Sequence, residues 1–88
     1  MKLNFSELKL YAIDGTKLNI EFHKLLANAI YVWVRDIRYL ELARNIYKGI
    51  EVDLSNEKLD AITEVVQNPS AGMAAFVREA YKKFIKKD

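Results

Sequence analysis

A helical apolar repeat that runs from Ile20 to Lys48, with no proline or glycine, most constrains how this chain can fold. Its apolar residues have the three- and four-residue spacing of one helix face: Leu26, Ala29, Ile30, Trp33, Ile37, Leu40, Ala43 and Tyr47. One straight helix over this repeat would be about 43 Å long. A compact domain of 88 residues is only roughly 31 Å across. We therefore predict a break near Arg35-Asp36 and two helices, over about residues 21–34 and 37–48.

The segment before this repeat predicts a β-hairpin. Apolar residues alternate on both sides of Asp14-Gly15, which is a strong turn signal. A three-residue loop over 13–15 would place Leu10 opposite Leu18 and match the apolar faces, whereas a two-residue loop would place Leu10 opposite Asn19. We therefore expect strands over about residues 3–12 and 16–20, with Gly15 in the left-handed conformation.

Two more helices are predicted in the second half of the chain. Ser55 suits the N-cap of a helix over about residues 56–67, and Asn68-Pro69 ends that helix, because the residue before proline avoids helical angles. A second apolar stripe predicts a last helix over about residues 71–86. The expected fold is thus α+β, mainly α: one domain, 1–88, with an N-terminal hairpin packed on about four short helices.

The residue content argues against catalysis. The chain has no cysteine, and its single histidine, His23, cannot build a Ser–His–Asp triad or a pair of histidine ligands. Asp53, Ser55 and Glu57 have the spacing of a calcium loop, but Lys58 stands where that loop needs glycine. We expect no enzyme, no catalytic residue, no cofactor, no metal and no small-molecule substrate.

Hydropathy and charge limit the location and the partners. No apolar run approaches the roughly 20 residues of a spanning helix, and Met1–Leu10 does not form the apolar core of a signal peptide, so we expect a cytoplasmic protein without membrane contact. Residues 23–49 and 71–88 each carry five basic and two acidic side chains, whereas 50–70 carry one basic and five acidic. This basic, acidic, basic order favours electrostatic complementarity within one chain or between chains. A nucleic-acid binder would instead need one broad basic face.

The run Ala29–Val34 is apolar or aromatic on every side of its predicted helix, which exceeds the stripe that a surface helix needs. In 88 residues a helix is difficult to cover all round, so this run is either plain core or a contact with another chain. We predict a non-catalytic protein-interaction or assembly module that self-associates or binds a protein partner. The candidate surface consists of aromatic and aliphatic side chains: Tyr31, Val32, Trp33, Val34 and Tyr39.

Residues 49–86 combine an alternating segment, Ile50-Glu51-Val52-Asp53-Leu54, with a helix and then the run Phe76-Val77-Arg78-Glu79-Ala80-Tyr81. This order resembles the ribbon-helix-helix family of DNA-binding proteins. The resemblance implies a transcriptional regulator in which two chains pair their strands and Glu51 and Asp53 enter the major groove. Phosphates oppose carboxylates there, so nucleic acid is the less favoured partner. Residues 50–54 otherwise form an extended linker.

Overall fold

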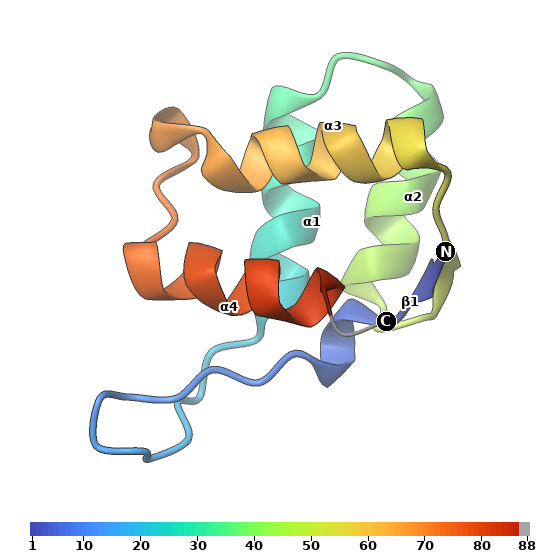
Figure 1. The fold of residues 1–88 in the computed structure, drawn as a ribbon. Helices are drawn as coiled ribbons and strands as arrows, with labels where there is room; N and C mark the ends of the chain where they lie inside the picture. Colours follow the sequence, from blue (N-terminus) through green and yellow to red (C-terminus); the bar gives the residue numbers. More distant parts are fainter. Residues whose placement is uncertain (87–88) are drawn as a thin grey trace.

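The computed structural model describes residues 1–86, apart from the side chain of Ser70. These residues form four helices and a small two-stranded sheet (Figure 1), which confirms the predicted α+β, mainly α class. The helices are α1 (Phe22–Trp33), α2 (Arg38–Tyr47), α3 (Asn56–Gln67) and α4 (Ala75–Ile85). The strands are β1 (Lys2–Leu3) and β2 (Val52–Asp53), and two 3-10 turns are η1 (Phe5–Glu7) and η2 (Pro69–Ala71).

The helices form two antiparallel pairs in two layers (Figure 1). The α3–α4 pair lies in front of the α1–α2 pair and crosses it. The predicted break in the long repeat is confirmed, because α1 ends at Trp33 and α2 begins at Arg38. The radius of gyration is 12.4 Å, so folding the repeat into a helical hairpin keeps the molecule compact.

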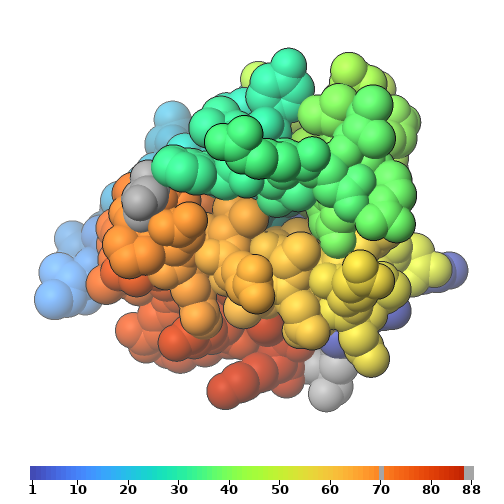
Figure 2. Space-filling model, turned by 90° about the horizontal axis from the view of Figure 1, so that it is seen from above, coloured from blue at the N-terminus to red at the C-terminus, as the bar shows by residue number. Residues whose placement is uncertain are grey.

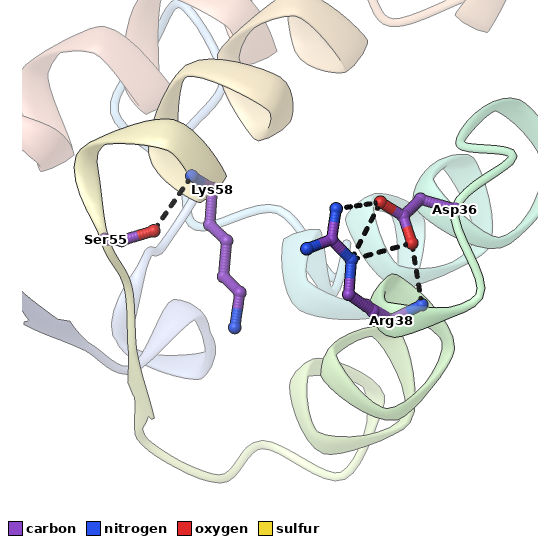
Figure 3. Close-up of polar contacts among 4 residues, drawn as sticks. All are labelled: Asp36, Arg38, Ser55 and Lys58. Carbon is purple, nitrogen blue, oxygen red and sulfur yellow. Dashed lines mark hydrogen bonds and ion pairs between the residues drawn. The ribbon is translucent and has the colours of Figure 1, made fainter.

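Side-chain caps start α2 and α3 (Figure 3). Asp36 Oδ1 accepts the backbone N–H of Arg38 at 3.0 Å, and the Arg38 guanidinium donates to both oxygens of the same carboxylate. Ser55 Oγ accepts the backbone N–H of Lys58 at 3.3 Å, as an N-cap serine does. Both contacts satisfy N–H groups that the first turn of a helix leaves free.

Gly49 ends α2 with a φ of +77°. Its N–H donates to the carbonyl of Ile46 at 3.0 Å, and the N–H of Ile50 donates to the carbonyl of Asn45 at 3.1 Å. This pair of bonds is the Schellman motif, which needs a left-handed residue at this position. The motif turns the chain sharply from α2 towards β2.

The sheet differs from the predicted hairpin. β1 pairs antiparallel with β2, with Lys2 opposite Asp53 and Leu3 opposite Val52, so residues 52–53 are a strand and not a linker. The expected strands over 3–12 and 16–20 are reduced to one bridge, Tyr11 to Lys17. The three-residue loop is confirmed, because Ala12 N–H donates to Thr16 O at 2.8 Å and Gly15 has a φ of +89°.

A cluster of aromatic rings joins the two layers of helices. The ring of Phe5, in η1, lies 6.3 Å from Phe22 of α1, 6.4 Å from Tyr81 and 5.9 Å from Phe84 of α4, measured between centroids. Phe5, Phe22 and Tyr81 are almost completely buried. The N-terminal segment is therefore part of the core and fixes α4 against α1.

Two predicted details are wrong. The last helix begins at Ala75, not at 71, because Pro69–Ala71 form η2 and Gly72 has a φ of +74°. The apolar stripe also does not continue from α1 into α2, since Ile37 and Tyr47 are exposed and α2 buries a different set: Tyr39, Leu42, Ala43 and Ile46. Because residues 34–37 are not helical, the 3.6-residue periodicity of α1 does not continue into α2, and α2 packs on the core with a different set of positions.

Candidate interaction surface

The exposed part of α1 is the outer side of a helix that is anchored on two others. α1 packs against α2 and α3 and buries one face: Phe22, Leu26, Ala27, Ala29 and Ile30. The opposite face comprises Lys24, Leu25, Asn28, Tyr31 and Val32, as a rotation of about 100° per residue requires. Lys24 is the one charged side chain among these five.

Three of the five predicted surface residues are exposed. The exposed fractions of their side chains are 63% for Tyr31, 68% for Val32 and 45% for Trp33. They are consecutive, large and apolar, and they lie at the end of α1 where the chain turns towards α2. The alternative that this run is plain core therefore does not describe these residues.

Val34 is half-buried and leaves the helix, with a φ of −88° and a ψ of 124°. Its N–H still donates to the carbonyl of Ile30 at 2.9 Å, which holds the chain close to the end of α1. Val34 and Trp33 line a shallow groove of about 290 Å³ against α3, with Ala61 and Val65 on the other side. Figure 2 looks down on this end, where the α1–α2 connection lies along α3.

Tyr39 does not belong to the surface. Only 7% of this residue is exposed, and it packs in the core on α2. Burial also raises the pKa of its hydroxyl above the ordinary value. The prediction failed here because the helical phase changes between Val34 and Arg38, which local sequence does not reveal.

Two exposed apolar residues were not among the predicted set. Leu25 lies seven residues before Val32 and so shares its helix face, and Ile37 is exposed in the α1–α2 connection. The spacing of Leu25 and Val32 could have indicated their common face. We use the term α1 surface for the exposed apolar side chains of this helix: Leu25, Tyr31, Val32 and Trp33.

The charged groups near α1 are largely paired with one another. Lys24 Nζ lies 2.6 Å from the Glu21 carboxylate and 5.5 Å from the centroid of the Tyr47 ring. The hydrogen bond between Lys24 and Glu21 lowers the pKa of the carboxyl and raises the pKa of the amine. Arg38 is paired with Asp36 in the same way. The α1 surface is thus apolar; at its edge Lys24 and Arg38 are paired, whereas Arg35 has no carboxylate within 4.0 Å among the described residues.

Other predicted features lie elsewhere in the fold. Glu51 and Asp53 are exposed, but β2 is already paired with β1 of its own chain, and the ribbon-helix-helix resemblance stays a prediction. His23 is partly buried near Gly49. Within residues 1–86, no three acidic or histidine side chains gather as metal ligands, and no helix has the length and hydropathy to cross a membrane.

Comparisons with known proteins found no relative of this chain. No protein family, no curated protein and no solved structure matches the chain. The indications of function therefore come from the α1 surface and from the chemistry of its residues.

Proposed function

We propose that this protein is a non-catalytic interaction module that self-associates through the α1 surface. The observation that carries the proposal is the exposure of Tyr31 and Val32 on the outer face of α1, together with that of Trp33 at the end of the same helix; burial of these side chains is favourable. Scattered exposed apolar residues are normal, whereas a contiguous group marks a contact site. Tyrosine and tryptophan are also frequent at the energetic centres of protein contacts.

A second copy is a suitable occupant of this surface. The exposed face of α1 carries one charge, Lys24, which is engaged by Glu21, so two copies meet without strong repulsion. In an antiparallel pair of α1 helices, Leu25 of one copy would lie against Val32 of the other. The smaller Asn28, which lies between them on the exposed face, would let the two helices approach closely.

The expected affinity is modest. Each large apolar side chain contributes roughly 1.5–3 kcal/mol when fully buried, and these three are already partly covered. The gross gain from two copies is therefore on the order of 5–10 kcal/mol, and the cost of association, about 4 kcal/mol or more, offsets at least half of it. We expect a weak monomer–dimer equilibrium, with dimer forming towards millimolar concentration.

The test is the solution mass by size exclusion with light scattering over a wide dilution range. The wild-type protein should shift from dimer to monomer on dilution, and the emission of Trp33, the single tryptophan, should move to longer wavelength. Val32→Glu should be monomeric throughout with unchanged circular dichroism. Ile13→Glu is the matched control, because Ile13 is also exposed but lies in the 13–15 loop of the hairpin that projects from the body. A wild-type monomer at millimolar concentration would contradict the proposal.

A further inference from the structure

Residues 8–12 form the first side of the hairpin, here called the arm, and one edge of this arm is open to another chain. The arm bonds to residues 16–18 on one side only, through Ala12 N–H to Thr16 O and Leu18 N–H to Leu10 O, both at 2.8 Å. These bonds flank the Tyr11–Lys17 bridge, so Tyr11 is in a non-hydrogen-bonded pair. In such a pair the N–H and C=O of each residue point away from the partner strand.

The outward backbone groups have no partner in the described part of the chain. Neither the N–H nor the C=O of Tyr11 takes part in a hydrogen bond there, and the same holds for Lys9, two residues earlier on the same edge. Both residues are exposed. A strand edge with free donors and acceptors is a template for an added strand.

A groove of about 780 Å³ runs along this edge. One wall is formed by the consecutive residues 7–13, and the other by α4, through Phe76, Ala80 and Phe84 among others. A groove over one face of a strand would be lined by every second residue, since successive side chains point to opposite faces. Lining by consecutive residues places the groove along the edge. Figure 1 shows the arm passing beside α4 towards a hairpin that projects from the body.

The charges indicate what kind of strand fits. Lys9, Tyr11 and Lys17 share the outer face of the arm, and neither lysine has a carboxylate within 4.0 Å among the described residues. On the α4 wall, Glu79 and Lys83 are paired at 3.2 Å and add no net charge. Glu7 also lines the groove, at its η1 end. Lys9 lies within the extended edge of residues 8–12, and its Nζ donates to the carbonyl of Ser6 at 3.2 Å, so an added strand would meet positive charge at Lys9.

The chain already contains one pair of this type. In the sheet, Lys2 of β1 lies opposite Asp53 of β2, and Leu3 lies opposite Val52. The arm repeats the alternation of β1 in Leu8-Lys9-Leu10, but nothing in the described residues pairs with its outer edge. We propose that the edge of residues 8–12 binds an extended peptide segment of another protein, in which apolar residues alternate with acidic ones.

This site is distinct from the α1 surface, and neither proposal depends on the other. The peptide's acidic residues lie opposite Lys9 and Tyr11 and exchange backbone hydrogen bonds with them. The apolar residue between these lies on the same face as the buried Leu10 and points towards the exposed ring of Phe76. Affinity comes from the backbone bonds and the apolar contacts, and the preference for acidic residues comes from Lys9.

The probe is the acetylated pentapeptide Ile-Glu-Val-Asp-Leu, which has the sequence of residues 50–54. It is titrated into the whole protein and followed by amide NMR shifts and amide hydrogen exchange. The amides of Lys9 and Tyr11 should shift and become protected. N-methylation of the peptide's Glu or Asp amide should weaken binding about tenfold, because each methyl removes a backbone bond. N-methylation of the Val amide, which points away from the arm, should leave the affinity within about twofold.

Protein variants test the charge and the edge. Lys9→Glu should weaken binding of the acidic peptide and strengthen binding of the charge-reversed peptide Ile-Lys-Val-Lys-Leu. Lys48 is an exposed lysine at the end of α2, and Lys48→Glu should change neither affinity. Tyr11→Pro removes a donor that the fold does not use and should weaken binding about tenfold, as the loss of one backbone bond does. Val32→Glu should bind the peptide normally. The proposal is overturned if no saturable shift appears, if the N-methylated Glu peptide binds undiminished, or if the affected amides lie outside residues 8–12.

Discussion

The hydroxyl of Thr63 on α3 lies 2.8 Å from the hydroxyl of Tyr81 on α4, and the direction of this hydrogen bond is fixed by a third group. Thr63 Oγ1 donates its single proton to the carbonyl of Leu59 at 2.9 Å, because a carbonyl can only accept. The Tyr81 hydroxyl is therefore the donor to Thr63. This bond joins the two helices of the front layer and satisfies the one polar atom of a buried tyrosine.

Tyr81→Phe should lower the free energy of unfolding by about 1 kcal/mol, because it removes this hydrogen bond. The cost is small because Thr63 Oγ1 still donates to the carbonyl of Leu59 and only loses the bond that it accepted. Thr63→Val should cost more, about 1–3 kcal/mol, since the buried Tyr81 hydroxyl then loses its acceptor. Urea unfolding of both variants and of the double variant measures the coupling. Strictly additive effects would show that the bond does not couple the two helices.

The same tyrosine should make stability fall at high pH. Burial raises the pKa of the Tyr81 hydroxyl above its ordinary value of 10.0. The unfolded chain therefore loses this proton first, and the free energy of unfolding decreases as pH rises from about 10 towards the folded-state pKa. Urea midpoints across this range should decline less steeply in Tyr81→Phe than in the wild type. Equal slopes would contradict the raised pKa.

Truncation to alanine should lower the free energy of unfolding strongly at Tyr39 and hardly at Tyr31. Tyr39→Ala leaves a cavity in the core and should lower the free energy of unfolding by about 3 kcal/mol. Tyr31→Ala removes a mostly exposed side chain and should change it by less than about 0.5 kcal/mol. The comparison is made by urea unfolding at a concentration where both variants are monomeric. A large loss for Tyr31→Ala in the monomer would place that residue in the core.

Gly49→Ala should destabilise the fold by about 1–2 kcal/mol, the cost of a left-handed backbone for an L-residue. The added Cβ would also lie 3.4 Å from Ser6 Cβ, on the segment that carries Phe5. Gly72→Ala is the control, because its φ is similarly positive but nothing lies within 4 Å of the new atom. A thermal or urea series should show the loss to be at least as large at Gly49. A neutral Gly49→Ala would argue against the Schellman motif at the end of α2.

The carboxyl of Asp36 should titrate below its ordinary value of 3.8, first because the Arg38 side chain donates hydrogen bonds to it and then because the Arg38 backbone N–H does. The start of α2 is thus supported above the unfolded-state pKa, and this support is lost as pH falls through the folded-state pKa. Carboxyl-carbon NMR follows the titration. In Arg38→Gln the midpoint should rise towards 3.8 but stay below it, because the backbone bond remains. An unchanged midpoint would exclude the guanidinium as the main cause.

Local signals predicted much of the helical framework. Ser55 and Pro69 mark the bounds of α3, Gly49 marks the end of α2, and the match of Leu10 with Leu18 selected the right hairpin loop. The break between α1 and α2 followed from the size of a compact domain. Each of these depends on residues close in sequence or on chain length alone.

The features that were missed depend on contacts distant in sequence. The pairing of Leu3 with Val52 involves strands of two residues each, too short for a pattern to show. The burial of Tyr39 depends on how residues 34–37 reorient the next helix. At the α1 surface, composition predicted Tyr31, Val32 and Trp33, but only the packing of α1 on α2 and α3 shows which side stays open.

The sheet also sets the order in which the fold can be completed. During synthesis β1 emerges first, but its partner β2 follows about fifty residues later, after both α1 and α2 have been made. Local helices form much faster than contacts that close long loops. The helical hairpin of α1 and α2 can therefore form early, while the apolar face of α1 that the rest of the chain covers, including Phe22, is still open to solvent. Closing β1 onto β2 can then follow, and α4, which is made last, completes the burial of Phe5 through Tyr81 and Phe84.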